Sequence, residues 1–225
     1  MLAPFAHSNL SIVVLASGEG TNLQAILDKS VEGTLPVTVK AVISDRTHTH
    51  ALTRARSAGV AAEICMPNDY PDREQYDAAL IKLIDRYKPG LVVLAGFMRI
   101  LSDIFVQHFH GHLLNIHPSL LPKYRRLHTH RRVLEAAEQE HGCSVHFVSR
   151  TLDGGPVIAQ IKVRVRPSDT EASLRARVLR QEHRLYPEVI GWFARGHLWL
   201  DDGQVVVDGK HLHTPIVLPA EESTE

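Results

Sequence analysis

The sequence has little that would suit a membrane protein, a disulfide-stabilised domain or a strongly charged partner. Only two cysteines occur in 225 residues, Cys65 and Cys143, so we expect a reduced, cytoplasmic protein rather than a disulfide scaffold. Lys and Arg number 25, as do Asp and Glu, so no net charge favours nucleic acid or an anionic membrane. Apolar runs such as 91–95 are too short to span a bilayer, and residues 1–7 lack the features of a signal peptide.

The composition is that of an ordinary globular protein, with 44% hydrophobic and 22% charged residues. The length suits one domain with short appendages. We therefore expect a loose N-terminal arm over residues 1–10, a single domain over 11–218 and an acidic tail over 219–225.

Strand-like and helix-like segments alternate along the chain. β-branched apolar runs predict buried strands over 11–16, 37–43, 61–64 and 91–95, and the 3.6-residue spacing of apolar side chains predicts helices between them, as over 72–87. This alternation predicts an α/β fold with a doubly wound, mostly parallel sheet. Further on we expect strands over 143–148 and 157–165, the latter antiparallel at the sheet edge. A helix over 171–193, interrupted by Pro187, comes next. Small C-terminal strands follow it.

Three candidate site elements follow predicted strands directly. They are residues 18–22, residues 96–101 and the polar pair within 115–117. Ligands of open α/β sheets bind at the carboxyl ends of the strands, so we expect these three elements at one edge of the sheet.

The first element, Ser17-Gly18-Glu19-Gly20-Thr21-Asn22, lies between a strand and a helix. Backbone N–H groups and the helix dipole converge at such a turn and attract an anion. Leu23 stands where a dinucleotide fingerprint has its third glycine, so a single phosphate fits better than a dinucleotide. The alternative is a plain strand-to-helix turn.

The second and third elements offer different chemistry. After residue 95, large apolar side chains with one Arg could hold a flat aromatic ligand, or could simply fill the core. Asn115 and His117, at positions i and i+2 of an extended chain, share a face and could stabilise an oxyanion while a proton moves. The alternative is a strand end with a capping Asn and a surface His. Asp153, followed by two glycines and a proline, sits in a tight turn, although Asp-Gly is also an ordinary turn former.

Fifteen histidines make zinc conceivable by ligand type. Neither a carboxylate nor a cysteine stands at familiar metal spacing from them, so we expect no metal site.

Taken together, these motifs resemble the phosphoribosylglycinamide formyltransferase family of folate-dependent formyltransferases. The resemblance runs from about residue 11 to 199 and is carried by the segments 17–25, 95–101, 115–123 and 152–156. It implies a Rossmann-like formyltransferase fold and transfer of a formyl group from 10-formyltetrahydrofolate to the amine of phosphoribosylglycinamide in purine biosynthesis. It also implies small-molecule substrates, no nucleic acid or membrane partner, and a monomer or homodimer.

By the same resemblance, the family's functional residues fall on specific positions of this sequence. The catalytic residues are Asn115, His117 and Asp153. The residues expected to bind phosphoribosylglycinamide are Gly20, Thr21, Asn22 and Glu182. The residues expected to bind the folate are Arg73, Met98, Arg99, Ile100, Leu101, Asn115, Ser149, Arg150, Thr151, Leu152 and Asp153.

The sequence departs from the family at three places. Arg125-Arg126 replaces a common Pro-Gly, Arg150-Thr151 replaces acidic residues, and Leu179 replaces a Gln one helical turn before Glu182.

Other functions compete with this interpretation. A formyltetrahydrofolate hydrolase shares the Asn, His and Asp but usually carries an extra N-terminal domain. A methionyl-tRNA formyltransferase would want an RNA-binding domain and a basic surface. A nucleotide-dependent reductase has only the incomplete glycine motif in its favour, and a non-catalytic folate-binding or phosphate-binding protein would leave Asn115, His117 and Asp153 without a task.

Overall fold

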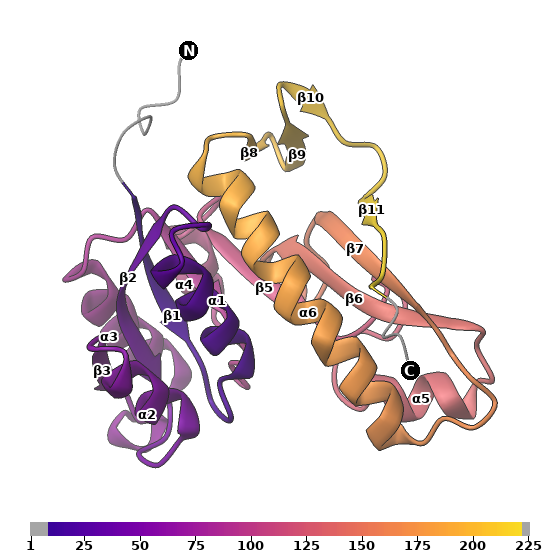
Figure 1. The fold of residues 1–225 in the computed structure, drawn as a ribbon. Coiled ribbons are helices and arrows are strands. Elements are labelled where there is room, and N and C mark those ends of the chain that lie inside the picture. The colour runs from indigo at the N-terminus through magenta and orange to yellow at the C-terminus, as the bar shows by residue number, and fades with distance from the viewer. Residues whose placement is uncertain (1–8, 222–225) are drawn as a thin grey trace.

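The computed structural model describes residues 9–221, which form an eight-stranded sheet flanked by helices and a second, three-stranded sheet (Figure 1). The predicted arm and acidic tail fall largely on residues 1–8 and 222–225, which lie outside the described residues. In chain order the elements are β1 (Leu10–Leu15), α1 (Thr21–Val31), β2 (Val37–Ser44), α2 (His50–Ser57), β3 (Ala61–Ile64), a 3₁₀ turn (Pro67–Asp69), α3 (Arg73–Asp85), β4 (Leu91–Leu94), α4 (Asp103–His108), β5 (Leu113–His117), α5 (Thr129–Glu135), β6 (Glu140–Phe147), β7 (Val157–Arg164), α6 (Glu171–Ala194), β8 (Leu198–Asp201), β9 (Gln204–Val207), β10 (Lys210–His211) and β11 (Ile216–Leu218).

The large sheet has the strand order β11-β7-β6-β5-β4-β1-β2-β3. The five strands from β3 to β5 run parallel to their neighbours, whereas β6 runs antiparallel to both β5 and β7. The central strand β1 is buried on both faces, which explains its continuous apolar run. The predicted doubly wound, mostly parallel sheet is confirmed.

Alternate residues of each strand enter two separate hydrophobic cores. Ile12 and Val14 belong to the core beneath α1 and α6, together with Leu23 of α1. Val13 and Leu15 face the other way and join Leu80 of α3 and Phe105 of α4. Helices thus cover both faces of the sheet and leave its strand ends free for a site.

The predicted convergence at the carboxyl ends is confirmed for the strands themselves. β1, β4 and β5 are adjacent and parallel, so the three candidate site elements leave the sheet at the same edge. Ser17 connects two of them, because its N–H donates to Gly96 O at 3.1 Å and its hydroxyl accepts from Met98 N–H at 2.9 Å.

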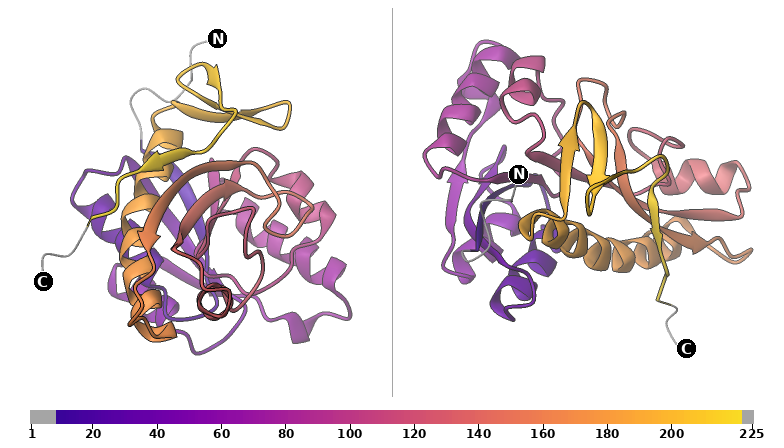
Figure 2. Two further views of the ribbon diagram at one scale, coloured as in Figure 1. Left: turned by 90° about the vertical axis from the view of Figure 1, so that its right-hand side faces the viewer. Right: turned by 90° about the horizontal axis from the view of Figure 1, so that it is seen from above.

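The antiparallel side of the sheet differs from the prediction in one respect. β7 is antiparallel to β6 as expected, but the outermost strand is the short β11, which pairs with β7 in parallel. Figure 2 shows the chain returning from the small sheet of β8–β10 to lie along β7. Glu221, predicted to belong to a loose tail, exchanges backbone hydrogen bonds with the Gln181 side chain of α6.

Two helices also differ from prediction. Pro187 does not interrupt α6, which runs unbroken over Glu171–Ala194. Proline removes one backbone hydrogen bond, but Leu185, Tyr186 and Val189 around it are fully buried, and that packing offsets the loss. The short helix α4 was not predicted, since six residues are too few to show helical periodicity; Ser102 caps it by accepting from Phe105 N–H.

None of the helices between residues 9 and 221 has both the length and the apolar character needed to cross a membrane.

Tyr186 provides a test of how α6 is fastened to the sheet. Its fully buried hydroxyl lies 3.0 Å from both Leu94 O of β4 and Leu114 O of β5. Tyr186→Phe should therefore lower the free energy of unfolding by about 1–2 kcal/mol, measured by urea denaturation. Tyr70→Phe is the control, because the Tyr70 hydroxyl makes a long and therefore weak contact of 3.9 Å with the Cys65 thiol. Equal losses in the two variants would contradict the fastening role.

Candidate active site

The site is built around the last residues of β5. Leu114 and Ile116 point into the core beneath α6, while Leu113 belongs to the core on the other face. Asn115 and His117 share the face of Leu113, as their spacing predicts. Asn115 is half-buried and His117 is buried, so both side chains are held by packing at the strand end.

His117 and Asp153 meet although they lie 36 positions apart in the chain. His117 Nδ1 is 3.6 Å from Asp153 Oδ1, and both side chains are 9% exposed. His117 Nε2 lies 3.0 Å from Tyr124 O, to which it donates. The Nδ1 contact has the distance of an ion pair rather than of a hydrogen bond. Because the Nε2 proton is committed to Tyr124 O, Nδ1 carries a proton only in the charged form of the ring, and that proton would lie beside Asp153.

Asp153 is held from two sides. Its backbone has φ 49°, in the left-handed region, and Gly154 N–H closes the turn by donating to Thr151 O at 2.9 Å. Its Oδ2 accepts from Arg126 N–H at 2.8 Å. Arg126 itself has φ 70°, a conformation that favours the glycine expected here from the resemblance. Although Arg126 departs from the expected glycine, its backbone N–H still donates to the Asp153 carboxylate.

His146 is a site residue that sequence reasoning missed. It lies directly opposite Asn115 in the antiparallel pairing of β5 and β6, and Asn115 Nδ2 is 3.0 Å from its Nε2. Burial lowers the pKa of His146 to about 4, so the ring is neutral at neutral pH. Its Nδ1–H donates to Phe147 O at 2.9 Å, which leaves Nε2 as an acceptor. The Asn115 side chain is therefore oriented with its amide nitrogen toward His146, and its second N–H remains free. Only the register of β5 against β6 could have revealed this pairing.

The glycine loop forms the second part of the site. Gly20 caps α1 in the left-handed region, with φ 68°, and a side chain there would come within 2.7 Å of the Ala51 backbone of α2. Glycine is required at this position on both counts. The first N–H groups of α1, at Thr21 and Asn22, have no partner within the helix, and a helix start of this kind attracts anions.

Asn22 and Glu182 connect this loop to α6. Asn22 Nδ2 donates to Glu182 Oε2 at 2.7 Å across 160 positions of sequence. Burial raises the pKa of Glu182 to about 7, against a weaker opposing effect of the Asn22 hydrogen bond. The predicted phosphate loop and the predicted acidic contact of α6 thus lie together.

Apart from Asn115 of β5, the residues expected to bind the folate lie on two loops and one helix start. Arg73 is the first residue of α3 and is exposed. Met98 and Ile100, in the loop after β4, are 60% and 58% exposed, and Leu152 is 39% exposed. Exposed large apolar side chains on adjoining loops indicate a surface for an apolar ligand.

Further contacts hold these loops in place. The Arg99 guanidinium lies 5.1 Å from the ring centroid of Tyr76 of α3, and Ser102 N–H, just beyond Leu101, donates to the buried Asp77 carboxylate at 2.5 Å. In the loop over residues 149–153, the Ser149 hydroxyl donates to Thr151 O at 3.2 Å, and Arg150 Nη2 donates to Gln107 of α4 at 3.1 Å. The departure at Arg150 is therefore accommodated by α4.

The histidines do not assemble into a metal centre within residues 9–221, where no group of three or more His, Cys, Asp or Glu side chains is placed to hold an ion. Two of them form a buried pair instead. His141 Nε2 and His130 Nδ1 are 2.9 Å apart, and burial lowers the pKa of His130 to about 4 and that of His141 to about 3.

Comparison with known proteins gives matches to one family. The formyl transferase family matches residues 10–190. Over 203 residues the chain is 53% identical to phosphoribosylglycinamide formyltransferase of Escherichia coli K12, covering 90% of this chain and 96% of the relative. It is 37% identical over 198 residues to the human trifunctional purine biosynthetic protein adenosine-3, covering 88% of this chain and 20% of that protein. The structure of phosphoribosylglycinamide formyltransferase from Coxiella burnetii superposes with a TM-score of 0.91 at 47% identity, covering 94% of this chain and 100% of that one.

The buried Glu182 carboxyl makes stability depend on pH. The pKa of this carboxyl is about 7 in the folded protein and has its ordinary value of 4.5 in the unfolded chain. Between pH 4.5 and about 7 the folded protein therefore keeps a proton on Glu182 that the unfolded chain has released. Stability from this group is present below pH 4.5 and is lost as the pH rises to about 7. Glu182→Gln should remove this loss, which amounts to roughly 3 kcal/mol, in urea unfolding at pH 5 to 8. The exposed Glu135→Gln should follow the wild-type curve. Parallel curves for Glu182→Gln and wild type would contradict the assignment.

Proposed function

The chain belongs to the formyl transferase family, and from this premise we infer the reaction that its site carries out. It transfers the formyl group of 10-formyltetrahydrofolate to the amine of N1-(5-phospho-D-ribosyl)glycinamide, giving the N2-formyl product and tetrahydrofolate, in purine biosynthesis. The observation that carries the assignment of the chemistry is the contact of His117 with Asp153 beside Asn115.

The reaction is an acyl transfer between two nitrogens. A bond forms between the glycinamide nitrogen and the formyl carbon, the bond from that carbon to N10 of the folate breaks, and one proton moves from the amine to N10. The amine is a competent nucleophile, so no covalent enzyme intermediate is required. Two tasks remain for the protein, which are to stabilise the oxyanion and to move the proton.

Asn115, His117 and Asp153 are assigned to these tasks. The free N–H of the Asn115 amide and the Nδ1–H of His117 donate to the oxyanion, because neither is committed to another hydrogen bond. Asp153 stabilises the charged form of the His117 ring and accepts the proton on its way from the amine. His146 acts through Asn115 as a positioning residue.

The two substrates are assigned to different loops at this edge of the sheet. The phosphate is assigned to Gly20, Thr21 and Asn22, and the Glu182 carboxyl is assigned to the ribosylglycinamide. The folate is placed against Met98, Arg99, Ile100 and Leu101, with Arg73 and the loop from Ser149 to Asp153 around it. Its large flat ring suits the exposed apolar side chains of these loops. No metal is assigned a role.

The phosphate loop favours transfer over hydrolysis. A formyltetrahydrofolate hydrolase uses water and needs no site for a phosphoribosyl group, whereas here the glycine loop and the Asn22–Glu182 hydrogen bond lie at the same sheet edge as the catalytic residues. Two of the relatives reported above, those from Escherichia coli and Coxiella burnetii, carry the transferase name.

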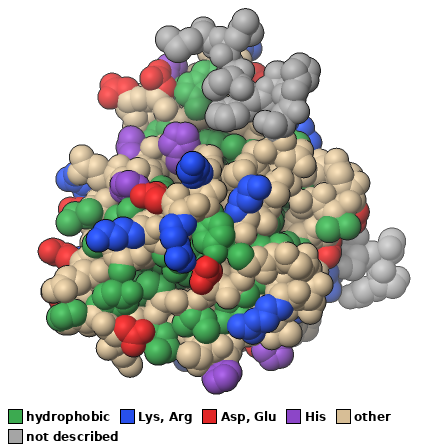
Figure 3. Space-filling model, turned by 90° about the vertical axis from the view of Figure 1, so that its left-hand side faces the viewer, with side chains coloured by type: hydrophobic (Ala, Val, Ile, Leu, Met, Phe, Trp, Pro, Cys, Tyr) green, Lys and Arg blue, Asp and Glu red, His purple; other side chains and the backbone are tan. Residues whose placement is uncertain are grey.

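We also propose a single domain over residues 11–218, because β11 completes the large sheet. The protein is assigned to the cytoplasm, where its two free, buried cysteines stay reduced, as a monomer or homodimer. It acts on small molecules rather than nucleic acid. Figure 3 shows acidic and basic side chains interspersed on one face, and the net charge is zero.

Asp153→Asn tests the catalytic assignment. The amide can still accept from Arg126 N–H, so the fold should persist, but it cannot pair with a charged His117 or take up a proton. Turnover should fall roughly 100-fold or more in a steady-state assay with both substrates, with thermal unfolding as the check on folding. Asp85→Asn is the matched control, because Asp85 pairs with His108 on the surface. Near-normal turnover of Asp153→Asn would reject the role.

A further inference from the structure

The glycine loop is held from one side by α2. Ala51 N–H donates to Gly18 O at 3.1 Å, and Arg54 Nε donates to Glu19 O at 2.9 Å. The next carbonyl, Gly20 O, accepts from Gln24 N–H at 2.9 Å as the first bond of α1. Three consecutive carbonyls of the loop therefore have fixed directions, and one of them is fixed by a side chain.

Fixing the carbonyls also fixes the amides. In a trans peptide the C=O and the following N–H point in opposite directions. When Glu19 O turns toward Arg54, the N–H of Gly20 turns away from α2. The same relation joins Gly20 O to Thr21 N–H. Successive amides directed to one side form an anion-binding concavity, and Arg54 sets the direction of the Gly20 amide.

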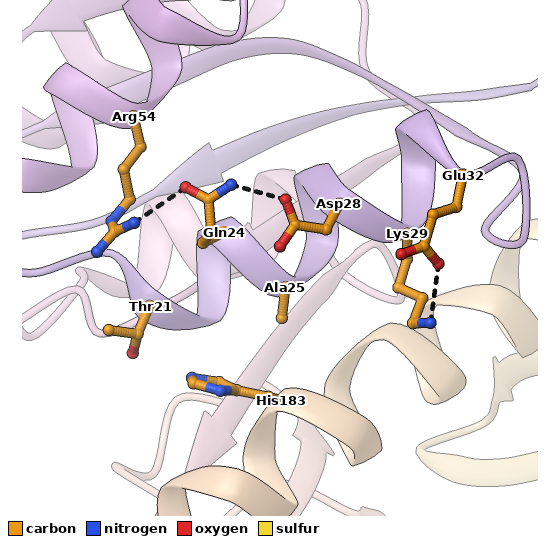
Figure 4. A pocket seen from close by; sticks show the side chains of 8 residues that line it. All are labelled: Thr21, Gln24, Ala25, Asp28, Lys29, Glu32, Arg54 and His183. Carbon is orange, nitrogen blue, oxygen red and sulfur yellow. Dashed lines mark hydrogen bonds and ion pairs between the residues drawn. The ribbon is translucent and has the colours of Figure 1, made fainter.

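Arg54 is itself held in place. Its Nη1 donates to Gln24 Oε1 at 3.0 Å, and Gln24 Nε2 donates to Asp28 Oδ1 at 2.7 Å, so the guanidinium spans from the loop to the outer face of α1 (Figure 4). This double contact uses the fork of the guanidinium, which a lysine lacks.

Arg54 also faces a groove beside the loop. Figure 4 shows Thr21 between Arg54 and His183, which line the groove from α2 and α6. His183 Nε2 is buried and has no hydrogen-bond partner among the described residues. Burial and the nearby Arg54 charge lower the pKa of His183. Arg54 thus places positive charge next to the first residue of α1.

We propose that Arg54 is a positioning residue for the phosphomonoester of the substrate. By holding Glu19 O it directs the Gly20 amide at the phosphate, and its charge adds to the field at the start of α1. This inference rests on the proposed function, since it takes the phosphate to bind at Gly20, Thr21 and Asn22.

The test compares Arg54→Ala with wild type on two acceptors, phosphoribosylglycinamide and ribosylglycinamide without the phosphate. Losing the contact should raise KM for the phosphorylated acceptor about tenfold or more. kcat should stay close to wild type, and kinetics with the phosphate-free acceptor should not change. Arg54→Lys should recover part of the loss, because it keeps the charge without the fork. Calorimetric titration with phosphoribosylglycinamide gives the binding change without turnover.

Arg56→Ala is the control, since Arg56 lies two residues along α2 with its side chain exposed. Equal effects of Arg54→Ala on both acceptors, or a fall in kcat at unchanged KM, would overturn the proposal. If Arg54→Ala does not fold, as judged by thermal unfolding, the same comparison is made with Arg54→Lys. If the wild-type enzyme has the same KM for both acceptors, the assignment of the phosphate to the glycine loop is itself wrong. That outcome needs no variant and is therefore distinguished from a failure of the Arg54 proposal.

Discussion

Parallel pairing of β1, β4 and β5 is the constraint on which the site depends. Because parallel strands end at the same edge, the glycine loop, the apolar loop and the Asn115–His117 pair emerge side by side. Ser17 then ties the first two loops together through hydrogen bonds with Gly96 and Met98. Asp153 comes from the antiparallel part of the sheet, where the β6–β7 connection folds back over the end of β5. The phosphate, the folate and the catalytic residues are therefore assigned to a single edge.

Buried partners hold the polar side chains of this edge. His146 is kept uncharged by burial and orients the Asn115 amide, whereas Glu182, whose pKa burial raises to about 7, accepts from Asn22. Burial thus disfavours the charged form of both partners. In each pair a side chain assigned to the substrates is fixed by a buried partner, which preorganises the site before binding.

Much of the fold could be predicted because its signals are local. Buried β-branched runs marked β1, β2 and β4, and helical periodicity marked α3. The strand-end rule then located the three loops of the site. The outer arrangement could not be predicted, since the short strand β11 is defined by its pairing with β7, and α6 passes through Pro187 because of tertiary packing.

The contacts that support the site were also beyond sequence reasoning. His146 depends on the register of two antiparallel strands, and Arg54 depends on the packing of α2 against a loop 35 positions earlier. Neither residue stands near a motif that would single it out. Residues expected to touch substrate were found from local pattern and resemblance, whereas those that position them required the three-dimensional structure.

We infer that this edge of the sheet transfers a formyl group to an amine rather than to water. The most direct measurement follows tetrahydrofolate release from 10-formyltetrahydrofolate, with and without phosphoribosylglycinamide, and identifies the product by mass. Our account predicts release only with the ribonucleotide, matched mole for mole by its formylated product. Equal release without the ribonucleotide would contradict the account.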